Sequence, residues 1–217
     1  MPEVSGRGAG RLGRRLAWGA MAFAALAVAG YALAMVMTPG LRGEFVVAMF
    51  RDEPLAAPAH LAGGAVAMLA GALQFAATLR RRHLPVHRWL GRVYVVAVAV
   101  SGTAGFSLAL TTSGGAPARF GFAAMALCWL LTTGMAFMRI LQRDVSRHQV
   151  WMVRSYALTL AAVSLRLYLP LGLANGVAFE SVYAVVAWLC WVPNLLLAEW
   201  LVLPLLQPRR RAAPGPA

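Results

Sequence analysis

The sequence predicts an all-α fold: a polytopic membrane bundle of six transmembrane helices with both termini in the cytoplasm. The first observation is a set of six apolar stretches, each near the roughly 20 residues that a helix needs to cross about 30 Å of hydrocarbon. The second is a composition that is 60% hydrophobic. Lipid offers the backbone no hydrogen bonds, so apolar segments of this length must be helical. The expected helices lie near residues 17–37, 57–79, 89–111, 119–141, 149–172 and 179–206.

The arginines supply the third observation, because they collect on every second connection between the apolar stretches. With a cytoplasmic N-terminus, sixteen of the 20 basic residues fall on the inner side. Cytoplasmic loops are enriched in basic residues, so we expect both termini on the inside of a bacterial inner membrane. The net charge of +13 is then expected to meet anionic lipid headgroups rather than nucleic acid. The inner arginines are Arg7, Arg11, Arg14, Arg15, Arg80, Arg81, Arg82, Arg88, Arg92, Arg139, Arg143, Arg147, Arg154, Arg209, Arg210 and Arg211.

The segments follow in order along the chain. Residues 1–15 are expected to be a flexible basic tail, and residues 16–206 the transmembrane domain. The first helix is preceded by arginines like a signal peptide, but its apolar run is long for one and favours an uncleaved helix. In the long loop 38–56, the apolar residues 45–50 are expected to lie on the membrane surface. Pro193 is expected to kink the sixth helix, and residues 207–217 to be a disordered basic tail.

Three of the expected helices carry small or polar residues at helical spacing, which places these residues on one face of each helix. Small residues let another backbone approach closely, whereas the polar face of the fifth helix is expected to point into the bundle. Each face includes one histidine at its head, so helix packing and a site between helices both stay open as interpretations. The faces are His148, Met152, Ser155, Thr159, Ala162 and Arg166 in the fifth helix, His60, Gly64, Ala67, Gly71, Gln74 and Thr78 in the second, and His87, Gly91, Tyr94, Val98, Ser101 and Gly105 in the third.

The polar residues at the inner end are expected to lie in layers at different depths in the membrane. His87 and His148 begin the third and fifth helices, which are parallel, so the two side chains are expected at matching depth. Arg92 and Arg154 lie one to two turns deeper. Glu199 is the only acidic residue well within a span, and we expect it to pair with Arg154 or Arg92, because an unpaired buried charge is costly.

The outer half of the bundle holds a second layer of polar residues. His60 and Arg166 are expected at similar depth, with Asp52, Glu53 or Glu180 as candidate counter-ions. Structural ion pairs and side chains that reach the headgroups explain such residues as readily as function does. The remaining intramembrane polar residues are Gln74 and Asn194.

Several motifs together resemble a known family. They are His60…Gly71, Gln74-Phe75…Arg80, His87-Arg88…Gly91-Arg92-Val93-Tyr94, His148…Trp151-Met152-Val153-Arg154-Ser155-Tyr156…Arg166 and Trp191…Pro193-Asn194…Glu199-Trp200. In this order, over roughly residues 55–200, they resemble a bacterial membrane protein family catalogued as domain of unknown function 2306. The resemblance implies a membrane fold and supplies no activity.

A looser resemblance, in helix count and histidine placement, is to the six-helix, ascorbate-reducible transmembrane cytochromes b. Those proteins hold two haems through paired histidines, one pair on helices two and four and the other on helices three and five. His87 and His148 match the second pair, whereas His60 on helix two has no histidine partner on helix four. The resemblance therefore implies at most one bis-histidine haem b. Its propionates would meet Arg88, Arg92 or Arg154.

Three classes of function stay open. The first is a redox protein with haem b on His87 and His148, which would favour electron transfer because two imidazoles leave no open iron position. The second is a small-solute or proton-coupled transporter, and the third is a non-catalytic accessory or sensory membrane subunit. A stand-alone enzyme is not expected, since the chain has no phosphate-binding loop, and its two cysteines, Cys128 and Cys190, lack metal-type spacing.

Overall fold

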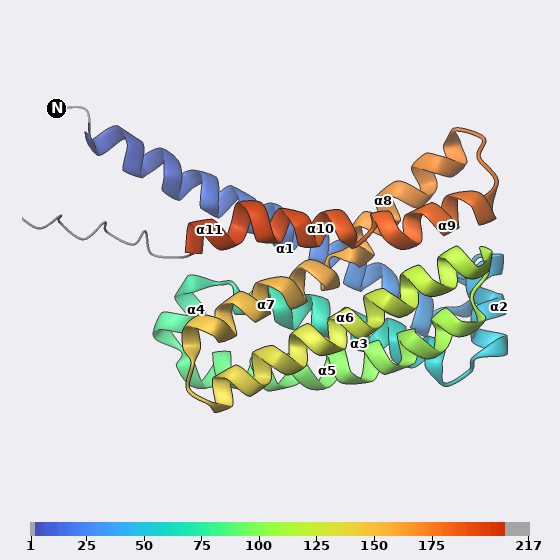
Figure 1. Ribbon diagram of the computed structural model, residues 1–217, viewed down its shortest axis with the longest axis horizontal. Helices are drawn as coiled ribbons and strands as arrows, with labels where there is room; N and C mark the ends of the chain where they lie inside the picture. Colours follow the sequence, from blue (N-terminus) through green and yellow to red (C-terminus); the bar gives the residue numbers. More distant parts are fainter. Residues whose placement is uncertain (1–2, 207–217) are drawn as a thin grey trace, which may run out of the picture.

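The computed structural model describes residues 3–206, and every regular element in that range is helical. Six helices are long and apolar enough to cross a membrane, which confirms the predicted architecture. Figure 1 shows them as one bundle, with the start of the first helix and the end of the last at the same end. The six candidate spans are Arg15–Met37, Ala56–Gln74, Leu84–Thr111, Gly115–Leu141, Val145–Ala174 and Phe179–Val202.

Short helices connect or divide the spans, so the element count exceeds six. The elements are α1 (Glu3–Met37), η1 (Pro39–Leu41), α2 (Glu44–Asp52), α3 (Ala56–Gln74), α4 (Ala77–Arg82), α5 (Leu84–Thr111), α6 (Gly115–Leu141), α7 (Val145–Thr159), α8 (Ala161–Ala174), α9 (Phe179–Leu189), α10 (Val192–Leu197), η2 (Ala198–Val202) and α11 (Leu203–Leu206). We call the end with α4 and the α6–α7 connection the arginine-rich end, and the end with α2 and the α8–α9 connection the far end (Figure 1).

The first helix is longer than the sequence suggests. It begins at Glu3, so residues 3–15 continue the helix where a flexible tail was expected. Residues 3–37 contain no proline, and the arginines, leucines and alanines among them are good helix formers. Flexibility of this segment stays a prediction. The expected C-terminal tail, 207–217, lies outside the described residues.

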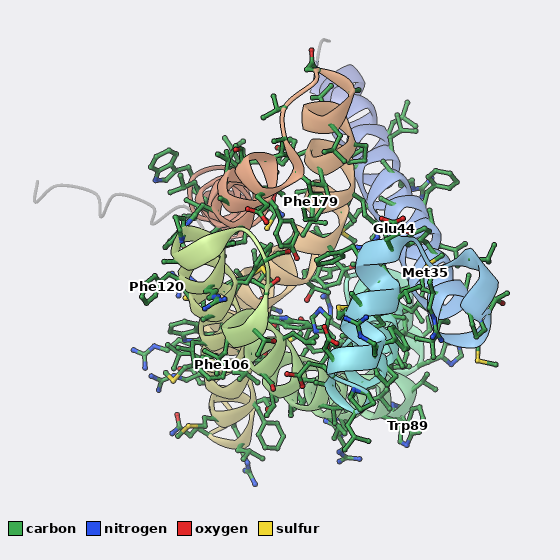
Figure 2. All side chains as sticks on the ribbon, turned by 90° about the vertical axis from the view of Figure 1, so that its right-hand side faces the viewer. Met35, Glu44, Trp89, Phe106, Phe120 and Phe179 are labelled. Atoms are coloured by element: carbon green, nitrogen blue, oxygen red, sulfur yellow. The ribbon has the colours of Figure 1, made fainter. Side chains whose placement is uncertain are left out.

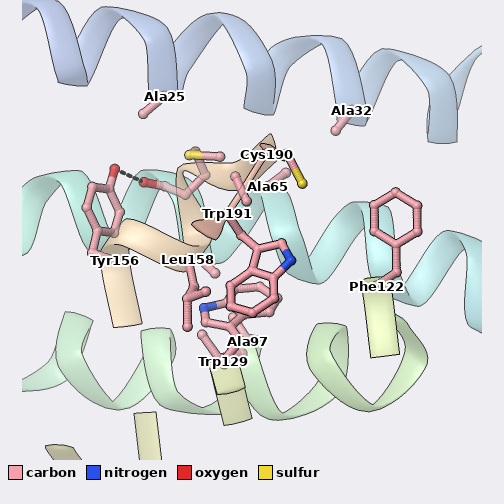
Figure 3. Packing of buried hydrophobic residues seen from close by; sticks show 14 of the residues in the cluster. Ala25, Ala32, Ala65, Ala97, Phe122, Trp129, Tyr156, Leu158, Cys190 and Trp191 are labelled. Carbon is pink, nitrogen blue, oxygen red and sulfur yellow. Dashed lines mark hydrogen bonds between the residues drawn. The ribbon is translucent and has the colours of Figure 1, made fainter. Parts of the chain in front are cut away.

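Small residues hold the centre of the bundle together. Ala25, Ala29 and Ala32 on α1 are buried and lie over α3, where Ala65 is also buried (Figure 3). The α6 helix packs between α5 and α7 and also against α9. Without a hydrophobic driving force between helices in lipid, close approach of small residues is what holds such helices together.

The periphery of the bundle carries large apolar side chains. Trp89 and Phe120 project from its outside in Figure 2, and their exposed fractions are 61% and 70%. Apolar groups exposed to this extent would be unfavourable in water, whereas hydrocarbon accepts them. The packing therefore agrees with a bundle that faces lipid.

The α2 helix covers the far end. The centroid of the Phe45 ring lies 5.4 Å from the ring centroid of Phe179 and 5.3 Å from that of Tyr183. Both of these residues are on α9. Residues 45–50, expected on the membrane surface, are therefore helical and pack partly on the bundle. Arg42 stabilises the turn before α2, because its guanidinium donates to the carbonyls of Met35 and Val36 at the end of α1.

The fifth and sixth spans are each interrupted. Between α7 and α8 the break falls at Leu160, and Figure 1 shows α8 turning away from the line of α7. The sixth span breaks at Cys190 and Trp191, just before Pro193, which cannot donate a backbone hydrogen bond. The predicted kink is thus confirmed.

Asn194 joins the two interrupted spans. Its Nδ2 donates to the carbonyl of Ala157 at 3.2 Å, and its Oδ1 accepts from the hydroxyl of Ser164 at 3.1 Å. Ala157 and Ser164 lie on either side of the break at Leu160. One amide therefore supplies hydrogen bonds where the regular helix is lost, as a break within a membrane requires.

Candidate functional site

Two cavities enter the bundle from opposite ends. The larger, which we call the basic cavity, has a volume of about 850 Å³ and opens at the arginine-rich end. It is lined mainly by α5 and α7 and by the residues around the α3–α4 and α6–α7 connections. The smaller, which we call the far cavity, has a volume of about 360 Å³ and lies under α2.

The basic cavity brings the two predicted histidines together. His87 and His148 each occupy the fourth position of their helices, α5 and α7, and both line the cavity. The Nδ1 atom of His148 lies 2.9 Å from the carbonyl oxygen of Ala136, so it carries the proton and donates. This leaves the Nε2 lone pair of His148 available to a ligand.

His87 offers a second unsatisfied group. Its Nδ1 atom is buried and has no hydrogen-bond partner among the described residues. The backbone here is held in place by Gln74, whose Nε2 donates to the carbonyl of His87 at 3.0 Å. The Gln74 side chain passes beside Gly91, one turn further along α5, where an added Cβ would lie 3.6 Å from its Oε1. Gln74 therefore positions the histidine helix and fixes its depth.

Arginines give the basic cavity its charge. Four of them line it, and no acidic residue is among its lining residues. Such a cavity attracts anionic groups, because unpaired guanidinium groups form strong hydrogen bonds with carboxylates and phosphates. The predicted Arg92 is one of the four. The full set is Arg80, Arg88, Arg92 and Arg143.

Arg154 does not line this cavity but forms an ion pair with Glu199. The pair is bidentate: Nε donates to Oε1, and Nη2 donates to Oε2 at 3.0 Å. This confirms that Glu199 pairs with one of the two predicted arginines, whereas a role of Arg154 beside a cofactor stays a prediction. The side chains are 26% and 36% exposed, so the pair is only partly buried. Trp151 covers the guanidinium of Arg154, whose Cζ atom lies 4.5 Å from the centroid of the Trp151 ring.

Glu199 stands in an unusual turn. Residues Ala198–Val202 form the π-helical element η2 within the sixth span. A π turn inserts one extra residue into a helix and often marks a functional position. Nothing in the sequence of this segment signals it.

A chain of hydrogen-bonded hydroxyl groups separates the two cavities, and we call it the hydroxyl network. The Tyr94 hydroxyl lies 2.7 Å from Oγ of Ser155 and 2.8 Å from Oγ1 of Thr159. Thr133 extends the chain at 2.6 Å from Ser155, and the indole N–H of Trp129 donates to Thr159. All five residues are buried.

The sequence identified only part of the hydroxyl network. Ser155 and Thr159 belong to the face of the fifth helix that was expected to point inward, and their burial confirms that expectation, whereas Tyr94 lies on the predicted face of the third helix and is also buried. Thr133 and Trp129 on α6 were not singled out, because α6 shows no polar periodicity. The network meets the far cavity at Trp129 and Thr159.

The far cavity contains the outer polar layer. His60 and Arg166 both line it, which confirms that they share a region. The Nδ1 atom of His60 lies 2.9 Å from the carbonyl of Ser101, and the Ser101 hydroxyl donates to the carbonyl of His60. None of the expected carboxylates pairs with Arg166 among the described residues. Its guanidinium instead donates to the carbonyl of Ala162 and lies over the ring of Tyr31.

Residues 3–206 contain no cluster of side chains typical of a metal site. No group of three or more histidine, cysteine, aspartate or glutamate side chains there could hold a metal ion.

The comparisons with known proteins give one match. A family model described as "Predicted membrane protein (DUF2306)" matches residues 58–202. The match covers most of α3 and the chain up to η2, and hence the basic cavity, the hydroxyl network and the Arg154–Glu199 pair, but not the parts of α1 and α2 that line the far cavity. No curated protein and no solved structure matches the chain.

Proposed function

This chain belongs to the DUF2306 family of predicted membrane proteins, and from that premise we propose that it is a transmembrane redox protein that binds one haem b in the basic cavity. The observation that carries the proposal is the lining of one cavity by two histidines and four arginines. If the protein is an enzyme, it is an electron-transfer oxidoreductase.

The residues of the basic cavity fit such a group. Its volume of about 850 Å³ lies within the roughly 300–1,000 Å³ typical of small-molecule sites. His148 presents Nε2, with its tautomer set by Ala136, and His87 lines the same cavity. Phe137 and Val95 add apolar walls, as a tetrapyrrole requires.

Each set of residues has a separate task. The histidines would ligate the iron, and the exposed side chains of Arg88 and Arg92 would neutralise the propionates. A haem held by two imidazoles exchanges single electrons and has no open position for oxygen. Gln74 would keep the depth of His87 constant through its hydrogen bond.

An optical spectrum tests the proposal directly. The protein, purified in mild detergent from haem-replete cells, is expected to show a Soret band and a reduced-minus-oxidised spectrum typical of haem b. The band should be lost in His87→Ala and in His148→Ala. His148→Met should keep haem with altered ligation and a higher reduction potential.

The matched control is His83→Ala. His83 lies just before α5, is exposed and does not line the basic cavity, so its removal should leave the spectrum unchanged. A pigment-free parent protein would overturn the proposal, and so would a band that survives in the His87→Ala, His148→Ala double variant. Gel filtration of each variant separates loss of haem from loss of fold.

Transport of a small solute is the second candidate. The observation that favours it is the pair of interrupted spans, because unwound helices near mid-membrane form the binding sites of many transporters. His60, Arg166 and Asn194 lie along such a path. A protein that lacks haem but moves solutes in vesicles would support this candidate over the first.

The cellular setting is part of the proposal. We infer a bacterial inner membrane, with the arginine-rich end in the cytoplasm and its arginines against anionic headgroups. The uneven distribution of arginines supports this orientation, because basic residues are retained on the cytoplasmic side.

A further inference from the structure

Arg166 is placed unusually deep for a membrane arginine. It lies eight residues before the end of α8, or about 12 Å along the helix. Its Nη1 donates at 2.9 Å to the carbonyl of Ala162, one turn back towards the centre of the bundle. Arginines near a membrane surface normally extend towards the nearer headgroups. The guanidinium of Arg166 points the opposite way.

This charge has no counter-ion among the described residues. The Nε atom of Arg166 is buried without a hydrogen-bond partner, and no carboxylate of residues 3–206 forms an ion pair with it. Asp52 pairs instead with Arg51 at 2.8 Å. Glu53 accepts a hydrogen bond from Thr111. A cation inside a membrane that lacks a partner is costly, and an anion from outside the chain would offset this cost.

His60 provides a second group at the same space. Its Nδ1 donates to the carbonyl of Ser101, so Nε2 carries a lone pair that can take up a proton, and only then donates to an anion. The ring fits only because residue 105 is glycine: a Cβ at Gly105 would lie 2.8 Å from Nδ1 of His60. The backbone of α5 is thus adapted to hold this imidazole at the wall of the far cavity.

The remaining walls determine what kind of anion fits. Most of the lining is apolar, from side chains such as Val28, Leu61, Leu108, Phe122 and Leu165. The volume of about 360 Å³ suits a small molecule. An inorganic anion would leave these apolar walls without contacts, whereas an organic molecule would cover them.

The rim of the far cavity limits the number of negative charges. Asp52 and Glu53 line the cavity near its mouth. Arg51 offsets the charge of Asp52 through an ion pair at 2.8 Å, whereas Glu53 forms no ion pair with the described residues. A ligand with a second negative group at the mouth would be repelled.

We infer that the far cavity binds a small organic monocarboxylate, with its carboxylate on Arg166 and His60 and its apolar body against the surrounding helices. Charge-assisted hydrogen bonds from the guanidinium would orient the ligand. The site lies at the opposite end from the basic cavity, so it is independent of haem binding. Binding at this site does not depend on whether the ligand crosses the membrane.

Calorimetric titration with 1-naphthoate tests the inference, and uncharged 1-naphthalenemethanol is the paired probe of similar shape. The detergent-solubilised protein should bind naphthoate saturably and should not bind the alcohol. In Arg166→Gln the affinity should fall by about tenfold or more, equivalent to about 1.4 kcal/mol. Arg166→Lys should retain part of it, because the positive charge remains.

Two further variants make the outcome decisive. Arg147→Gln removes an arginine that is 68% exposed at the other end, and it should bind like the parent protein. Ala162→Leu fills the cavity beside Arg166 without removing charge, and it should abolish binding even if Arg166→Gln fails to fold. Equal binding of the alcohol, undiminished binding in Ala162→Leu or no saturable binding by the parent would each overturn the inference.

Discussion

Two arginines on the same span, Arg154 and Arg166, have opposite surroundings. Arg154 meets Glu199 through two parallel hydrogen bonds, whereas Arg166 donates to a backbone carbonyl and leaves its Nε without a partner. A cation that is already paired holds helices together. A cation that lacks a partner attracts a ligand, and this difference assigns a structural role to the first and a binding role to the second.

Removal of the carboxylate in Glu199→Gln should lower the thermal midpoint of the detergent-solubilised protein. Loss of charged hydrogen bonds costs about 1–3 kcal/mol, and the partial exposure of the pair favours the lower part of that range. Arg154→Gln should have a similar effect, and the double variant should lose less than the sum of the two.

Glu180→Gln is the matched control for this prediction. Glu180 is exposed in the first turn of α9 and forms no ion pair with the described residues, so its midpoint should equal that of the parent. Strictly additive losses in the double variant would mean that Arg154 and Glu199 do not stabilise each other.

At the scale of helices, a tightly packed contact between helices lies next to a break in one of the spans. The α3 helix passes Tyr94 of α5 and Tyr156 of α7 with only Gly71 between them. The hydroxyl of Tyr156 donates across this contact to the carbonyl of Met68 at 3.1 Å (Figure 3). Beyond this contact the fifth span breaks at Leu160, so the half that packs against α3 ends at the break and the half beyond it lines the far cavity.

Gly71→Ala should therefore disturb the protein more than an ordinary glycine substitution does. The added Cβ would lie 2.9 Å from Cε2 of Tyr94 and closer still to the ring of Tyr156. Overpacking of this kind costs about 1–3 kcal/mol, and the thermal midpoint should fall. Gly134→Ala, where a Cβ meets nothing within 4 Å, should be neutral or slightly stabilising, because alanine favours helix. Equal midpoints for the two variants would contradict the close approach.

Across the whole molecule, the cavities at the two ends of the bundle differ in the charged residues that line them. The cavity at the arginine-rich end is lined by four arginines and no carboxylate, whereas the cavity at the far end has Asp52 and Glu53 near its mouth. The two openings thus differ in the charge that an entering solute meets first. This asymmetry agrees with the orientation proposed from the distribution of arginines.

Reporter fusions would establish that orientation. Fusions after residues 83 and 143 should report the cytoplasm, and a fusion after residue 114 should report the opposite side, because arginines collect around the first two positions. A strong external signal at 83 or 143 would reverse the assignment of the two cavities to the two sides of the membrane.

Periodicity and charge together predicted the helices and one ion pair. The inward faces follow from spacing along each helix, and Glu199 needed an arginine because it is the only acidic residue deep in a span. The direction of the Arg166 side chain could not be predicted, since it depends on how α1 and α8 cross. Leu160 gives no sign of a break, because no proline or glycine accompanies it. The cavities likewise arise from packing between distant segments.

The hydroxyl network has an electrical consequence. Water that fills an open cavity carries the potential of its own side inward, so a membrane voltage falls mainly across the part that stays dry. Between the basic cavity and the far cavity that part is the thin layer around Tyr94 and Ser155, both fully buried. The voltage drop would then be compressed into a fraction of the bilayer thickness. An electron or proton that crossed this layer would be driven by nearly the whole membrane potential, about 2.3 kcal/mol per 100 mV.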